Sequence, residues 1–242
     1  MHDLAKASKG DKASFDRMYN GYLNQSLKLS VEKVEDKAKN KMITFQSLGF
    51  IVMFLMLGVS MTTGMILKEK RNRTYFRICS APVNSREYLL ANILANTLIV
   101  IVQVILIIVV MKKVFGISTY VPDIELFIIL LLFGISAIGM GMVIVSFSKS
   151  TFQSDTLSTL VITPTCMLGG CFWPIKFMPS ILKKASYFMP QRWTLDAVEA
   201  LQNGKSISDI AIHLCILVAF TIVFFIVAAY RFSTSDDIKK FI

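Results

Sequence analysis

The sequence predicts an all-α protein, a polytopic bundle of helices that spans a membrane. Its 242 residues are 54% hydrophobic and have a mean hydropathy of +0.60, which is too apolar for a domain that stays dispersed in water. The apolar residues are gathered in five long runs, at about 42–67, 88–111, 126–148, 157–175 and 207–230. Charged residues lie at the rims of these runs, as expected of segments inside a bilayer.

Each run is long enough, or nearly so, to cross a hydrocarbon core of about 30 Å at about 1.5 Å per residue. We therefore expect five transmembrane helices within residues 42–242. Residues 1–41 form a separate, polar segment. In it Phe15, Tyr19 and Tyr22 recur at helical spacing, which predicts a helical stripe suited to a partner, the bilayer surface or another part of the protein.

The first two runs carry small and polar residues at helical spacing. In the first run, Ser60 lies one turn before Gly64, and small pairs of this kind let helices approach closely in lipid. In the second run, Asn92, Asn96 and Gln103 share one face. Interhelical hydrogen bonding explains these amides, and the sharper alternative is that they line a substrate path.

Residues 68–87 are strongly basic, with six Lys or Arg interleaved with aromatic and aliphatic side chains. This pattern is typical of a short amphipathic helix at the headgroups or docked into a partner, and a plain basic loop is the alternative. Pro82 would end such a helix. Asn84 and Glu87 then form a capping-box-like start for the next helix.

The third run contains Gly134, Ala137 and Gly141 on one face, which favours tight helix packing. The fourth run contains Pro164, whose missing N–H leaves a carbonyl that neighbouring Thr hydroxyls can satisfy. It is followed by Gly169-Gly170 and by a stretch of mixed apolar and polar residues up to about 204. Irregular backbone cannot cross lipid, so this stretch predicts re-entrant helices protected by the spans.

The last run is apolar apart from His213, with no acidic partner evident in the sequence. A hydrogen-bonded helix residue is the expected role of this histidine. The net charge of +10 indicates contact with anionic lipid rather than nucleic acid. Phosphate-binding loops, zinc-protease motifs and serine-nucleophile elbows are absent, and the cysteine spacing does not suit a metal.

Two stretches resemble the permease subunits of ABC-2 type transporters, the membrane halves of ATP-driven exporters. The first runs from Glu69-Lys-Arg-Asn-Arg-Thr to Ala81-Pro82-Val83 and Glu87. In that family such a stretch forms a cytoplasmic coupling helix that touches the ATPase, although Arg73 stands here where the family pattern has glycine. The resemblance assigns this coupling role to Glu69, Arg71, Thr74, Arg77, Pro82 and Glu87.

The second stretch is similar to the family's G-x-x-(F/W)-P, M-P and P-x-x-(W/Y) pattern before the final span. There it forms re-entrant outer helices that close the export path. The matching residues, which the resemblance assigns to an outer gate, are Gly169, Gly170, Trp173, Pro174, Pro179, Pro190 and Trp193.

The resemblance covers about 42–242 and implies a permease subunit in the bacterial cell membrane. It would export an amphipathic drug, antibiotic, lipid or ion with a separate ABC ATPase and a second permease copy or paralogue. This chain would not be an enzyme and would hold no cofactor, because ATP and Mg²⁺ bind to the ATPase. Members usually have six spans, so residues 1–41 would be the remnant of an external domain that follows a first span.

The family topology places residues 68–87 in the cytoplasm. Of the 26 Lys and Arg residues, ten would then face the cytoplasm, which is fewer than the positive-inside rule favours. We adopt the family topology because a coupling segment must meet a cytosolic ATPase. The alternative functions are a membrane scaffold or sensor subunit without transport, and an inactive truncated permease.

Overall fold

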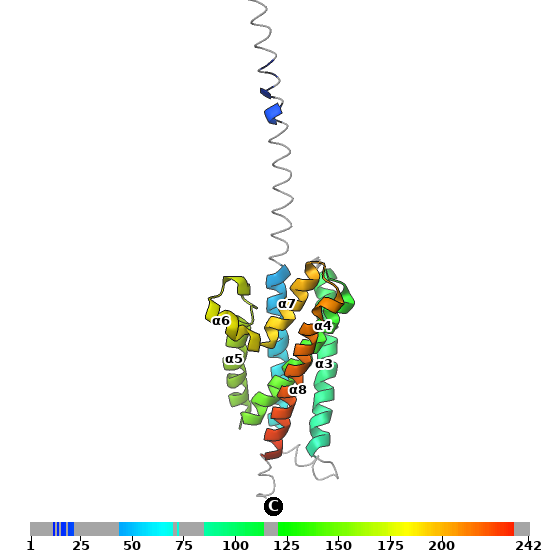
Figure 1. Ribbon diagram of the computed structural model, residues 1–242. Helices are drawn as coiled ribbons and strands as arrows, with labels where there is room; N and C mark the ends of the chain where they lie inside the picture. Colours follow the sequence, from blue (N-terminus) through cyan, green and yellow to red (C-terminus); the bar gives the residue numbers. More distant parts are fainter. Residues whose placement is uncertain are drawn as a thin grey trace, which may run out of the picture. The chain divides into compact units, whose positions relative to one another are not determined.

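The computed structural model describes residues 44–69, 72, 85–113 and 121–234, together with several residues between 12 and 21 (Figure 1). The chain divides into two units, Met1–Ile43 and Thr44–Ile242. The described residues of the first unit, Tyr19 among them, are helical. Phe15 and Tyr22, the other members of the predicted stripe, lie outside the described residues.

Every regular element among the described residues of the second unit is a helix. In chain order they are Thr44–Glu69, α3 (Ser85–Lys113), α4 (Asp123–Phe147), α5 (Thr151–Leu168), η1 (Ile175–Phe177), α6 (Ser180–Ala185), η2 (Ser186–Phe188), α7 (Pro190–Gln202) and α8 (Ile207–Thr234). The predicted all-α class is confirmed for this part of the chain. We refer to Thr44–Glu69 as the first helix.

Four of these helices are long and apolar enough to cross a membrane: the first helix, Leu90–Lys113 of α3, α4, and Ile207–Arg231 of α8. They coincide with four of the five predicted runs. The protein is therefore a multi-pass membrane protein, as the sequence indicates. The fourth run, by contrast, does not form one apolar helix over 157–175.

Helix α5 begins six residues earlier than the fourth run, at Thr151, and ends at Leu168. The Ser150 hydroxyl accepts a hydrogen bond from the Gln153 backbone N–H and so caps its start. Its end is set by Gly170, whose φ of +91° lies in the left-handed region that glycine adopts without strain. Inside the helix, the Thr165 hydroxyl donates to the Val161 and Ile162 carbonyls next to Pro164.

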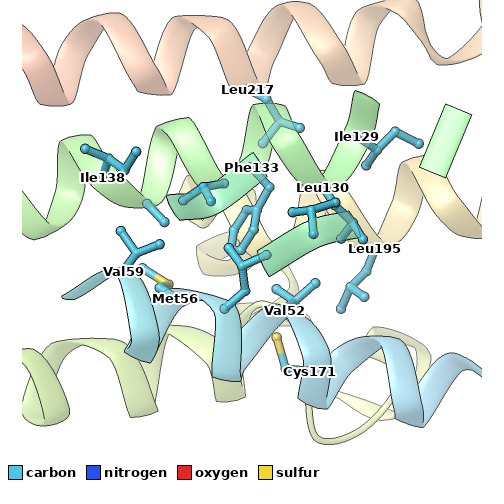
Figure 2. Packing of buried hydrophobic residues seen from close by; sticks show 14 of the residues in the cluster. Val52, Met56, Val59, Ile129, Leu130, Phe133, Ile138, Cys171, Leu195 and Leu217 are labelled. Carbon is cyan, nitrogen blue, oxygen red and sulfur yellow. The ribbon is translucent and has the colours of Figure 1, made fainter. Parts of the chain in front are cut away.

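Helix α4 is the centre of the bundle. Of the residues in its most apolar stretch, 67% are buried, compared with 17% in α3 and 11% in α8. It packs on α8, α3, α7 and α5. Phe133 and Leu130 of α4 project into a cluster with Val52 and Met56 of the first helix, and Leu195 of α7 joins them (Figure 2). Burying such side chains stabilises a bundle through close packing, since lipid is as apolar as the interior.

Glycines on α4 let the neighbouring helices approach closely. A Cβ built on Gly134 would lie 2.4 Å from Val100 of α3, and one built on Gly139 would lie 2.9 Å from Phe224 of α8. At Gly141 the nearest atom would be Thr63 Oγ1 of the first helix, at 2.5 Å. Two members of the predicted small-residue face, Gly134 and Gly141, thus contact different helices, and Gly139 adds a contact that the sequence analysis did not include.

The small residues of the first helix divide between two neighbours. Ser60 donates a hydrogen bond to Ser158 of α5 over 2.5 Å, and Gly64 faces Ser154 of the same helix. Gly58, on another side, faces the Gln103 amide of α3. Ser60 and Gly64, the small pair noted in the sequence, therefore mark the contact of the first helix with α5, and Gly58 marks its contact with α3.

The contact at Gly141 gives a test of this packing. We expect Gly141→Ala to destabilise the bundle by about 1–3 kcal/mol, because its methyl group would press on a β-branched Thr63 that is already bonded to two carbonyls. Thermal unfolding in detergent measures the loss. Gly64→Ala is the matched control: its Cβ would meet nothing closer than 3.8 Å, and alanine favours a helix by about 1 kcal/mol. Equal unfolding temperatures for the two variants would contradict the close approach.

Candidate functional site

Residues 169–193, which we call the turn segment, comprise the connection from α5 to α7 and the first turn of α7. The chain leaves α5 through a hydrogen bond from the Gly169 N–H to the Thr165 carbonyl and another from the Cys171 N–H to the Cys166 carbonyl. The first helix passes directly beside this turn. A Cβ built on Gly49 would lie 2.1 Å from the Cys171 carbonyl oxygen, so the two backbones touch.

Three prolines of the turn segment lie where a helix begins. Pro174 precedes η1, and Pro179 precedes α6. Pro190 is the first residue of α7, where its missing N–H costs no helical hydrogen bond. Trp173 is 40% exposed, and its neighbour Phe172 packs edge-on against Phe50 of the first helix.

Gln191 joins the turn segment to two helices of the bundle. Its side chain is fully buried. The Nε2 group donates to Thr165 Oγ1 of α5 over 3.1 Å and lies 3.0 Å from the Met56 sulfur of the first helix. Gly169 provides the space, since a Cβ there would lie 2.7 Å from the Gln191 Cβ. A buried amide held in this way fixes the position of the α7 N-terminus.

Arg192, the next residue, holds α6 and η2 against α7. Its guanidinium donates to the Lys183 carbonyl over 2.8 Å and to the Ser186 hydroxyl, and it stacks on the Tyr187 ring at 3.6 Å. Its Nε also donates to Asp196 one turn further along α7, over 3.2 Å. The planar, five-donor guanidinium is suited to several such contacts at once.

The remaining predicted gate residue, Trp193, donates its indole N–H to the Tyr187 carbonyl over 2.9 Å. Lys176 of η1 forms an ion pair with Glu199 of α7 at 2.7 Å. These elements enclose a pocket of about 270 Å³ that Phe45 of the first helix also lines, together with Pro174 and Lys183. The predicted gate residues thus lie in one structured assembly.

Two ionisable groups of this assembly have shifted pKa values. Burial raises the pKa of the Asp196 carboxyl, and Arg192 opposes this effect through its hydrogen bond and charge. The hydrogen bond to Glu199 raises the pKa of the exposed Lys176 ammonium. For Asp196 the effect of burial is the larger one, so its pKa lies above the ordinary value despite the nearby cation.

The amides of α3 differ in their surroundings. Asn96 is 4% exposed and donates to the Asn92 carbonyl over 2.8 Å within its own helix. Gln103 lies further along, beside a groove of about 480 Å³ between α3 and the first helix that Gly58 and Thr62 also line. Of the three predicted path residues, Gln103 is the one that lines this groove.

Most of the predicted coupling residues, Arg71, Thr74, Arg77 and Pro82, lie outside the described residues. Glu69 is the last residue of the first helix, and Glu87 is exposed in the first turn of α3. In Figure 1 this end of the bundle lies opposite the end that carries α6 and α7. The two predicted regions are thus separated by the length of the spans.

One exposed polar surface was missed by the sequence analysis. Helix α5 buries Ser154, Ser158 and Ile162, and the opposite face exposes Thr156 and Thr159 with a half-buried Thr163. We call these three residues the threonine stripe. The hydroxyls of Thr156 and Thr159 donate to carbonyls of their own helix. The spacing was visible in the sequence, but which face of α5 is exposed depends on tertiary packing.

Comparison with known proteins decides the family. A family model described as ABC-2 family transporter protein matches residues 3–230. The chain belongs to the ABC-2 transporter family. Members are membrane transport subunits and normally work with an ABC ATPase partner, so the resemblance noted in the sequence is confirmed.

Individual relatives are named for resistance and transport. The linearmycin resistance permease protein LnrN of Bacillus subtilis (strain 168) is 28% identical over 178 residues, which are 73% of this chain and 46% of that protein. The probable multidrug ABC transporter permease YbhS of Escherichia coli (strain K12) is 21% identical over 72% of this chain and 46% of its own length. The inner membrane transport permease YhhJ of the same organism is 28% identical, with shares of 73% and 48%. The chain spans about half the length of these curated relatives.

The contact between Gly49 and Cys171 gives a second test. We expect Gly49→Ala to displace the turn segment, because its methyl group would overlap a backbone carbonyl that cannot rotate away. Cys171, which is 1% exposed, should then react at least several-fold faster with a membrane-permeant maleimide. Peptide mapping by mass spectrometry identifies the labelled cysteine, and the exposed Cys215 reports equal reagent access. Protection of Cys171 equal to that in Gly64→Ala would refute the contact.

Proposed function

We propose that this ABC-2 protein is the membrane-spanning permease subunit of an ATP-driven exporter of amphipathic antibiotics or drugs in the bacterial cell membrane. The observation that carries the proposal is the family match over residues 3–230. Relatives named for linearmycin resistance and for multidrug transport support the substrate class. Their bacterial sources support the location.

The course of the chain supports five crossings rather than four. Helices α4 and α8 both run from the end that carries α6 and α7 toward the opposite end (Figure 1). The chain between them must therefore return, and α5 makes this return with 18 residues, about 27 Å at 1.5 Å per residue. Residues 42–242 would then form a five-span transmembrane domain with η1, α6, η2 and α7 as its re-entrant outer part.

The threonine stripe supports a place for the transport path. A helix that crosses lipid exposes apolar side chains, since polar groups there lose their hydration. Helix α5 turns three threonines away from the bundle beside the exposed Phe152 and Leu160. The adjoining first helix exposes Phe54, Met61 and Met65. A surface of hydroxyl, aromatic and thioether groups matches an amphipathic ligand. We place the path along this surface, facing a second permease subunit.

The two ends of the bundle would have different roles. The turn segment would close the path on the outer side, with Trp173 and Pro174 at its edge. Residues 69–87 would receive the motion of a separate ABC ATPase, which binds ATP and Mg²⁺. The resulting shift between inward and outward access is a change of population between two packed states.

Charge reversal tests the coupling role. We expect the double variant Arg71→Glu, Arg77→Glu to abolish stimulation of the partner ATPase by the substrate. The reversed charges would repel the acidic surface of the ATPase that a basic segment would dock on. Co-purification with the ATPase and drug-stimulated ATP hydrolysis measure the effect. Lys205→Glu, at an exposed site at the far end of the bundle, is the control. Full stimulation in the double variant would argue against docking at this segment.

Substitution of the threonine stripe tests the path. Replacing Thr156, Thr159 and Thr163 with valine should lower resistance to an amphipathic antibiotic by about tenfold, equivalent to about 1.4 kcal/mol of lost binding to the permeating substrate. The hydroxyls of Thr156 and Thr159 bond to carbonyls of their own helix, and valine is close to threonine in size, so folding should be preserved. Thr221→Val on α8, whose hydroxyl also bonds within its own helix, is the control. Equal resistance in both variants would place the path elsewhere.

A further inference from the structure

The pocket of about 270 Å³ in the turn segment has one apolar wall and one charged wall. Phe45 of the first helix, Pro174 and Ile175 supply the apolar wall. The charged wall is formed by side chains of η1, α6 and α7, three basic and two acidic: Lys176, Lys183, Arg192, Asp196 and Glu199. A pocket with this mixture suits a ligand that carries a charged group on an apolar body.

The cations of this pocket exceed its carboxylates by one. Lys176 pairs with Glu199 at 2.7 Å, and Arg192 pairs with Asp196 at 3.2 Å. The half-buried Lys183 is left over: its ammonium group makes no ion pair or hydrogen bond with the residues that the structure describes. An anion beside this ammonium would be bound more strongly than in open water, because the surroundings screen charge less.

Arg192 supplies further donors to the same pocket. Its hydrogen bonds to Asp196, to the Lys183 carbonyl and to the Ser186 hydroxyl use the Nε and Nη1 groups. None of these bonds uses the Nη2 group. A guanidinium and an ammonium that line one pocket match the several acceptor oxygens of a phosphate group.

The short helices that carry the lysines of the pocket also expose apolar side chains. Phe177 of η1 and Ile181 of α6 are each 78% exposed, and Phe188 of the following η2 is 76% exposed. These side chains lie at the end of the bundle that carries α6 and α7 (Figure 1). Basic side chains at the end of a span keep their charge at the level of the headgroups, while apolar neighbours enter the lipid. The arrangement therefore fits an amphiphile whose anionic head enters the pocket.

We propose that this pocket binds the phosphodiester headgroup of an anionic phospholipid, held by the Lys183 ammonium and the Arg192 guanidinium. The acyl chains of the lipid lie against Phe177 and Ile181. Because Lys183 belongs to α6 and Arg192 to α7, a bound headgroup links these two helices. The lipid composition of the membrane then contributes to the position of the turn segment. This inference goes beyond export, and its test needs neither the transported substrate nor the ATPase.

Two neighbouring lysines provide a matched comparison, since Lys183 lines the pocket and the exposed Lys184 does not. Native mass spectrometry of the full-length protein in a neutral detergent measures lipid binding. We expect dioleoyl phosphatidylglycerol to bind about tenfold more tightly than dioleoyl phosphatidylcholine, which has the same chains and no net charge. Lys183→Gln should weaken phosphatidylglycerol binding by about tenfold, through loss of one charge-assisted hydrogen bond. Lys184→Gln removes the same charge from an exposed site and should change binding by less than about twofold.

The conservative variant Lys183→Arg, which keeps the positive charge, should regain most of the affinity that Lys183→Gln loses. Equal losses in Lys183→Gln and Lys184→Gln would overturn the proposal, and so would equal binding of the two lipids. The lipid comparison uses the unmodified protein, so it decides the question even if Lys183→Gln does not fold. Displacement of phosphatidylglycerol by millimolar inorganic phosphate would show a site for the free anion and overturn the assignment to a lipid.

Discussion

The close approach of neighbouring helices to α4 is the constraint on which the rest of the bundle depends. Lipid offers no hydrophobic force to drive helices together, so contact distance decides their association. Gly134, Gly139 and Gly141 bring α3, α8 and the first helix within reach of the α4 backbone. The large side chains around Phe133 then fill the spaces between these contacts.

The sequence predicted the parts of the fold that depend on local pattern. Run length and the exclusion of charge located four spanning helices, because a bilayer imposes both requirements on any crossing. The predicted ends of the fourth span were wrong. The apolar run 157–175 does not reveal that Ser150 caps the start of α5, or that a glycine-dependent turn at Gly170 ends it. Capping and backbone geometry count for more at these boundaries than hydropathy does.

The site was only partly predictable for a similar reason. Motif spacing singled out the residues predicted to form a gate, and the structure gathers these residues in one assembly. It could not show that Gln191 and Arg192, between the recognised Pro190 and Trp193, make the contacts that hold this assembly together. The partners of Gln191 are distant in sequence, and those of Arg192 become its neighbours only because the chain turns between α6 and α7. The exposed face of α5 likewise depends on how whole helices pack.

The seam between the first helix and α5 is built from small hydroxyl residues rather than interlocking aliphatic ones. Ser60 bonds to Ser158, and the buried Ser154 hydroxyl one turn earlier has no partner among the described residues. If α5 slid by one turn, about 5.4 Å, Ser154 would come opposite Ser60 and could replace the bond that was lost. Such a shift would exchange one serine pair for another, but it would also move Ile162, which α5 buries in the same row, out of its place in the core.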